Sequence, residues 1–232
     1  MVNPELRKRF VNSMRFLREM GFFQDYSNLS SEEILDKILN GEIDLKSQWF
    51  VEEWSEEMRS KLRSGTFGSD LEEHEEYWMK ASDSEIDLWL AFFDMKRVFV
   101  EDPEAVIREG ICKSLMKKLA RISRGVFNPT YVREEMSKWR QKPPPAWMKP
   151  HFDWGFIFKV YFKFRDREHS VEFYSASDFI DMNPAVKRIN ELIKDTGYQY
   201  YCLHDTDQII YVVLSKDEVE ELTKRGWKLS LP

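Results

Sequence analysis

Residues 142–150 read KPPPAWMKP, and this proline-rich stretch divides the chain into two halves with different hydrophobic patterns. Because proline cannot continue a helix or donate to a sheet ladder, the backbone must run extended here. Before the stretch, apolar residues recur at helical spacing, and after it they alternate as in strands. The sequence therefore predicts a helical domain at 1–142, a proline-rich strap at 143–150 and an α+β domain at 151–232.

Large apolar side chains lie in and beside the strap, among them Trp147 and Trp154. A flexible linker would not normally carry so much apolar surface. We therefore expect both tryptophans to be buried and the strap to fasten the two halves together.

The first half contains several helix starts. Asn3 before Pro4 is typical of a helix N-terminus, and Ser30 with Glu33 forms a capping box. Ser84 is the expected cap of a further helix. These signals support the helical assignment of the first half.

The second half reads as strand, strand, helix, strand, strand, helix. Residues 156–164 alternate between apolar and polar, residues 198–203 and 208–214 form a second strand pair, and Asn183 before Pro184 starts the helix between the pairs. This ββαββα order predicts a two-layer α+β sandwich with a four-stranded, mainly antiparallel sheet.

The charge is unevenly distributed along the chain, although the net charge is only -6. Residues 21–100 hold 19 acidic and 8 basic side chains, and residues 101–160 hold 7 acidic and 12 basic ones. A polyanion would be repelled by the first region and tolerated by the second. The two regions therefore favour different partners.

By elimination, the leading hypothesis is a non-enzymatic protein-binding module, such as an inhibitor, an immunity-type protein or an adaptor. Its acidic helical surface would meet a basic protein, with electrostatics steering association. The same glutamates could instead serve only to keep the protein soluble. The candidate partner-binding residues are Glu52, Glu53, Glu56, Glu57, Glu72, Glu73, Glu75 and Glu76.

Nucleic-acid binding is the first alternative. An amphipathic helix within 107–122, a turn at Gly125 and a helix starting at Asn128-Pro129 resemble a helix-turn-helix in outline over 107–140. Any short helical hairpin gives the same outline. The basic candidates are Lys113, Lys117, Arg121, Arg124, Arg133 and Arg140.

An enzyme with a site between the two domains is the second alternative, but no motif supports it. His204, Asp205 and Asp207 are potentially catalytic residue types, yet a turn of this composition is also a default hairpin tip. Asp70 and His74 could face one metal ion, but a zinc site needs at least three protein ligands. We therefore predict no catalytic residue, metal or cofactor.

Neither a signal peptide nor a membrane span is expected. The N-terminus is polar and charged, and no window approaches 18 consecutive apolar residues. Two cysteines, Cys112 and Cys202, lie in apolar patterns and are expected to be buried hydrophobes rather than a disulfide framework. These observations predict a soluble cytoplasmic protein without membrane partners.

Overall fold

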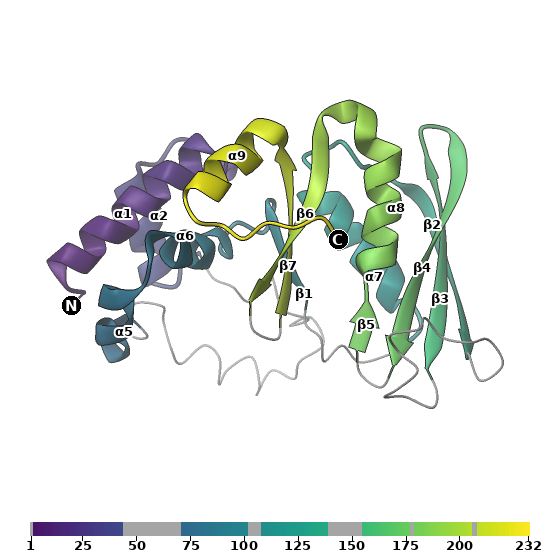
Figure 1. The fold of residues 1–232 in the computed structure, drawn as a ribbon, viewed down its shortest axis with the longest axis horizontal. Helices are drawn as coiled ribbons and strands as arrows, with labels where there is room; N and C mark the ends of the chain where they lie inside the picture. The colour runs from purple at the N-terminus through teal and green to yellow at the C-terminus, as the bar shows by residue number, and fades with distance from the viewer. Residues whose placement is uncertain (1, 44–70, 102–107, 139–154, 177–178, 206–207) are drawn as a thin grey trace. The chain divides into compact units, whose positions relative to one another are not determined.

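The computed structural model describes residues 2–43, 71–101, 108–138, 155–176, 179–205 and 208–232 (Figure 1). The chain divides into two compact units. Unit 1 holds residues 1–100 and 217–228, and unit 2 holds residues 101–216 and 229–232. The strap at 143–150, Trp147 and Trp154 lie outside the described residues, so the division at the strap stays a prediction.

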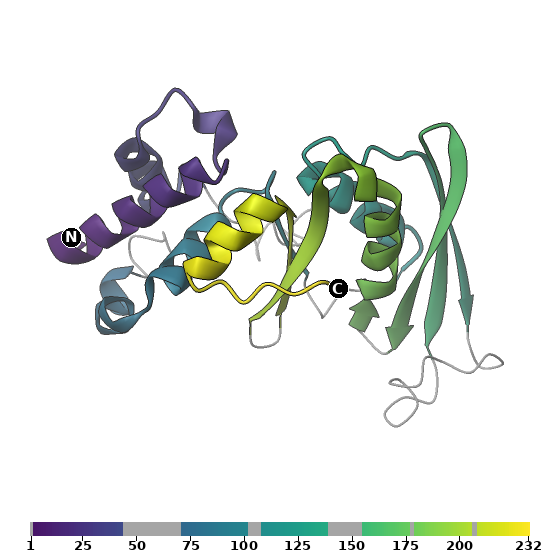
Figure 2. The same ribbon diagram turned by 45° about the horizontal axis from the view of Figure 1, so that its top comes forward.

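Unit 1 is built mainly from helices, and α1 packs on both α2 and α6 (Figure 2). Asn3 caps α1 as the sequence predicts, because its Oδ1 accepts the Glu5 N–H at 2.9 Å and Pro4 follows directly. The described elements of this unit are α1 (Pro4–Glu19), the 3-10 helix η1 (Gln24–Tyr26), α2 (Ser31–Leu39), α5 (Glu75–Lys80), α6 (Asp83–Ala91), most of β1 (Val98–Glu101) and all but the first residue of α9 (Lys216–Lys224).

Two capping boxes begin helices in unit 1. The predicted box of Ser30 and Glu33 is confirmed at the start of α2. At α6 the cap is Ser82, whose side chain accepts the Glu85 N–H, and the prediction of Ser84 is wrong by two residues. Ser82 is the cap because Glu85 lies three residues after it and completes the capping box, whereas Asp87 lies at the same spacing from Ser84.

Helix α9 belongs to unit 1 although it lies near the end of the chain. Arg97, on the N-terminal side, contacts Glu218 of α9 at 3.4 Å, with side chains 5% and 15% exposed. Phe22 and Trp227 place their ring centroids 6.3 Å apart. Leu222 is fully buried. Unit 1 is therefore completed by a segment more than 100 residues away from its other helices in the sequence.

Unit 2 contains a four-stranded antiparallel sheet of order β2-β3-β4-β5. Its strands are β2 (Thr130–Lys138), β3 (Phe156–Phe164), β4 (Arg167–Ala176) and β5 (Phe179–Asp181). Alternation along β3 places Phe158, Val160 and Phe162 on the buried face, as the sequence predicts. The remaining strands, β6 (Tyr198–Asp205) and β7 (Gln208–Ser215), pair antiparallel in a separate sheet of order β1-β7-β6.

Helices α7 (Ile111–Ile122) and α8 (Asn183–Ile193) lie on the same face of the four-stranded sheet (Figure 1). They also contact the second sheet: the Tyr200 hydroxyl on β6 donates to the Leu119 carbonyl of α7 at 2.7 Å. Asn190 of α8 donates to the Tyr200 carbonyl at 2.9 Å and accepts its N–H at 2.7 Å. The two helices therefore form a layer between β6 and the four-stranded sheet.

The segment 128–138 corrects the sequence analysis. It was predicted to be the second helix of a hairpin, but Thr130–Lys138 is strand β2, paired antiparallel with β3. These residues form a strand because they pair with β3, a partner from elsewhere in the sequence. The Asn-Pro pair before them is not specific to helices, because it also begins turns. Within 108–138, the described part of the proposed segment 107–140, there is therefore no helix-turn-helix.

The α+β class is confirmed, with helices in both units and two antiparallel sheets. The two predicted strand pairs lie in different sheets rather than sharing one. Within the described ranges, no helix is both long and apolar enough to span a bilayer.

Candidate protein-binding surface

Helix α5 and the helical residues just before it hold several exposed acidic side chains and one exposed tyrosine. Glu72, Glu73 and Glu76 are exposed, and Tyr77 is 57% exposed. We call these four residues the acidic α5 surface. An exposed tyrosine can supply both apolar contact area and a hydrogen-bonding hydroxyl to a partner.

Helix α5 packs on the rest of unit 1 through an aromatic cluster of Trp78, Phe10 and Trp89. Trp78, next to the exposed tyrosine, is only 3% exposed. Its ring meets Phe10 of α1 at 5.7 Å and Trp89 of α6 at 5.3 Å, both edge to face, and Tyr77 itself at 5.2 Å. Such edge-to-face pairs add to the stabilisation from area burial. The cluster therefore fixes the short helix in place although six residues alone would not form a stable helix.

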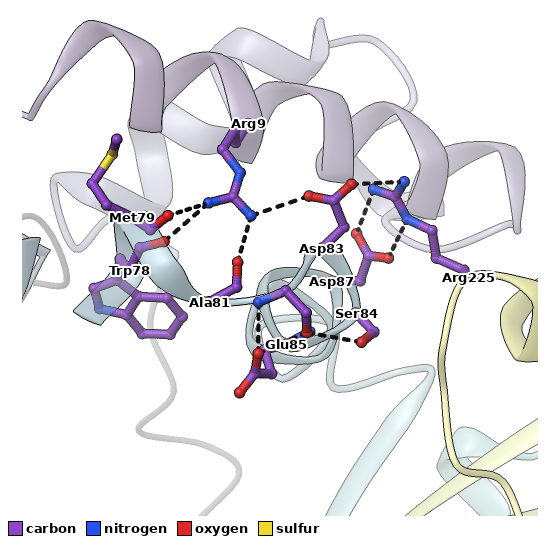
Figure 3. Close-up of polar contacts among 10 residues, drawn as sticks. Arg9, Trp78, Met79, Ala81, Asp83, Ser84, Glu85, Asp87 and Arg225 are labelled. Carbon is purple, nitrogen blue, oxygen red and sulfur yellow. Dashed lines mark hydrogen bonds and ion pairs between the residues drawn. The ribbon is translucent and has the colours of Figure 1, made fainter. Parts of the chain in front are cut away.

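Arg9 of α1 fixes the other end of α5 (Figure 3). One of its guanidinium nitrogens donates to the carbonyls of Trp78 and Met79 at 3.2 and 3.1 Å, and the other donates to that of Ala81 at 2.5 Å. These carbonyls lie at the C-terminal end of the helix, where they have no partner within it. A cation at this end also complements the helix dipole.

The same guanidinium begins a chain of alternating charges that reaches α9 (Figure 3). Arg9 contacts Asp83 at 3.2 Å, and the other oxygen of Asp83 lies 3.2 Å from Arg225. Arg225 in turn donates from Nε to Asp87 at 2.8 Å. This chain of ion pairs therefore connects α1, α6 and the residue after α9.

Asp87 is the buried end of this chain. Its side chain is fully buried, and burial raises its pKa while the hydrogen bonds from Arg225 oppose that shift. At Glu85, by contrast, the hydroxyl and N–H of Ser82 lower the carboxyl pKa. The first carboxyl forms an ion pair within unit 1, and the second completes the capping box of α6.

The structure tests only part of the predicted partner surface. Glu52, Glu53, Glu56 and Glu57 lie outside the described residues. Glu72, Glu73 and Glu76 are exposed. Glu75 is half-buried, and its carboxylate accepts a hydrogen bond from Asn3 at 3.0 Å.

Sequence reasoning missed Tyr77 as a surface residue. It adjoins Trp78 in the sequence, and neighbouring residues on a helix lie about 100° apart, so one of the two had to face outward. That signal was available, but deciding which one is buried requires the positions of Phe10 and Trp89.

The basic candidates do not form one binding helix. Lys113, Lys117 and Arg121 lie on α7, and Arg124 lies in the turn after it. Arg133 lies on β2, where it contacts Glu135 and covers the Tyr161 ring at 4.5 Å. Arg140 lies outside the described residues.

The two polar clusters that the sequence analysis weighed and disfavoured are not tested by the structure. Asp70 lies outside the described residues, as does Asp207, and the side chains of His204 and Asp205 are not described. Across the described ranges, no three His, Cys, Asp or Glu side chains are grouped so that they could hold a metal ion.

Both predicted buried cysteines are buried and free of disulfides, as the sequence indicates.

Comparison with known proteins adds no assignment. The chain matches no protein family, no curated protein and no solved structure.

Proposed function

We propose that the protein is a non-enzymatic protein-binding module that meets a basic partner through its acidic α5 surface. The observation that carries the proposal is the exposed Tyr77, which follows Glu76 on α5, a helix held in place by the ring contacts of Trp78 and by Arg9. Tyrosine is among the residues that most often dominate interface energies, and a rigid scaffold lowers the entropy cost of binding.

Charge supports the same partner class. Unit 1 contains 25 acidic and 16 basic side chains, a net charge of -9, whereas unit 2 contains 16 acidic and 19 basic ones, a net charge of +3. A basic protein would be steered toward unit 1 at low ionic strength. Among the described residues, Glu76 forms an ion pair with the exposed Lys80, at 2.6 Å. Such an exposed pair is weak and would hardly hinder a cation of the partner from binding Glu76.

The first test is affinity capture from an extract of the source cells, at low and at moderate salt. Wild-type protein should retain a basic protein, whereas Tyr77→Ala and Glu73→Lys/Glu76→Lys should each lose it. With the purified partner, we expect Tyr77→Ala to weaken binding by about 30-fold, which is roughly 2 kcal/mol for a central interface residue.

A matched control separates the surface from the overall charge. Glu19→Lys/Glu220→Lys makes the same charge change at exposed positions of unit 1 outside α5, and it should still retain the partner. Circular dichroism would verify that all variants stay folded. Retention by both surface variants, or an empty capture with wild-type protein at both salt concentrations, would refute the proposal.

The cytoplasmic location expected from the sequence is part of this proposal.

A further inference from the structure

Helix α7 of unit 2 presents a second charged surface, independent of the acidic α5 surface. Its buried residues all lie on one side of the helix: Ile111, Cys112, Leu115, Met116, Leu119 and Ile122. Lys113, Lys117 and Arg121 fall on the other side, within about 80° of each other at 100° per residue. Together with Arg124, just beyond the helix, we call them the basic stripe. Lys113, Lys117 and Arg124 are exposed. Arg121 is half-buried, and its guanidinium nitrogens Nε and Nη2 are buried, so the accessible cations of the stripe are the other three.

The neighbourhood of the stripe contains few acids. Residues 110–133 hold six basic side chains and no acidic one, in a chain with 41 acidic residues. Among the residues that the structure describes, neither Lys113 nor Lys117 forms an ion pair. A solvated helix face on a protein of this composition would normally alternate its charges.

A carboxylate from β2 contacts the backbone of α7. Glu134 of β2 accepts the N–H groups of Gly110 and Lys113, both at 2.8 Å. It therefore satisfies the N-terminus of the helix and compensates the positive end of its dipole. An anion bound to α7 would meet the lysine side chains instead of this helix end.

The far end of the stripe is held in position. The Arg124 guanidinium lies over the Tyr198 ring, 4.7 Å from its centroid, and the Arg124 backbone is left-handed with φ of 59°. A cation fixed against an aromatic ring loses less side-chain entropy when it meets a second group.

We propose that the basic stripe binds the phosphate backbone of a nucleic acid without reading its sequence. The side chains at the stripe are cations, which contact phosphates, and α7 contains no Asn or Gln of the kind that pairs with adenine. The absence of a helix-turn-helix agrees with backbone contact alone. This surface would act whether or not unit 1 binds a protein.

The test is fluorescence anisotropy with the whole chain and two labelled probes, a random-sequence 20-base-pair DNA duplex and a single strand of the same length. At low salt we expect binding to at least one probe. With three phosphate contacts, from Lys113, Lys117 and Arg124, log K should fall with log salt concentration with a slope of about -3 on the duplex, or somewhat less on the single strand.

The decisive variant is Lys113→Gln/Lys117→Gln. Because two phosphate contacts disappear, its slope should become shallower by about 2, and its affinity at low salt should fall by about 10-fold or more. The control is Lys187→Gln/Lys194→Gln, which removes the same charge from exposed positions of unit 2 outside the stripe. It should keep the wild-type slope.

Three outcomes would overturn the proposal. One is that neither probe binds at low salt, and another is that both variants lose affinity equally, which would indicate only overall charge. The third concerns vesicles of equal parts phosphatidylserine and phosphatidylcholine. If the stripe variant lost vesicle binding while nucleic-acid binding stayed unchanged, the stripe would be a membrane contact.

Discussion

Asp87 and Arg225 show how a single ion pair can hold distant parts of a chain together. Asp87 lies on α6 and is fully buried, whereas Arg225 follows α9 and also covers the ring of Phe16 at 5.0 Å. Burial of a carboxylate costs several kcal/mol unless a cation and hydrogen bonds compensate it. The pair therefore need not stabilise unit 1 relative to an apolar pair, but losing one member should be costly.

We predict that Arg225→Met lowers the free energy of unfolding by about 3 kcal/mol at neutral pH, because Asp87 is left as an uncompensated buried charge. The folded protein binds the Asp87 proton more tightly than the unfolded chain does, since burial raises the pKa above 3.8. The deficit should therefore shrink as the pH falls through the raised pKa, where Asp87 becomes neutral. Urea unfolding from neutral pH down to about pH 4 measures both effects.

Arg188→Met is the matched control for this change. Arg188 pairs with Glu191 on the surface of α8, with both side chains about half exposed, at 48% and 64%. Such a pair contributes about 0.5 kcal/mol or less. An Arg225→Met deficit that stayed constant with pH would show that lost packing, rather than the charge of Asp87, is responsible.

At the scale of elements, β2 does more than extend the sheet. Its outward side chains at Arg133 and Glu135 face Tyr161 and Lys159 of β3, a mixed and solvated surface. Its inward Glu134 instead caps α7. One strand therefore sets the position of the helix that carries the basic stripe.

We predict that Glu134→Ala lowers the free energy of unfolding by about 1–2 kcal/mol, because two N–H groups at the helix start lose their acceptor. The neighbouring Glu135→Ala removes a carboxylate that contacts only exposed Arg133 and the Tyr161 hydroxyl, and it should cost about 0.5 kcal/mol or less. Urea unfolding of the two variants gives the comparison. Amide exchange at Gly110 and Lys113 should become faster in Glu134→Ala alone, and equal exchange in both variants would contradict the capping role.

At the scale of the whole molecule, local signals predicted elements well and their assembly poorly. Capping residues such as Asn3 and Ser30 identify helix starts because the chemistry involves only residues within one turn. The alternation in β3 is equally local. By contrast, β2 is a strand because β3 pairs with it, and that partner is not encoded within 130–138.

The candidate surfaces follow the same rule. The acidic and basic side chains were visible as runs and stripes in the sequence, but the exposure of Tyr77 depends on aromatic partners from α1 and α6. The assignment of α9 to unit 1 depends on Arg97 and Asp87, which lie over 100 residues earlier. Sequence patterns on α9 itself show only an amphipathic helix after β7.

This chain order gives the last prediction. Leu222 of α9 is fully buried and follows β7 by only seven residues, yet it belongs to unit 1. Leu222→Ala should cost about 2–5 kcal/mol, and the loss should fall on unit 1. In hydrogen exchange, peptides from α1, α2 and α6 should exchange faster, whereas those from β6 and β7 should keep their protection.

Ile189→Ala, an equally buried change in α8, should give the reverse pattern. If Leu222→Ala instead loosened residues 198–215, α9 would be energetically part of unit 2.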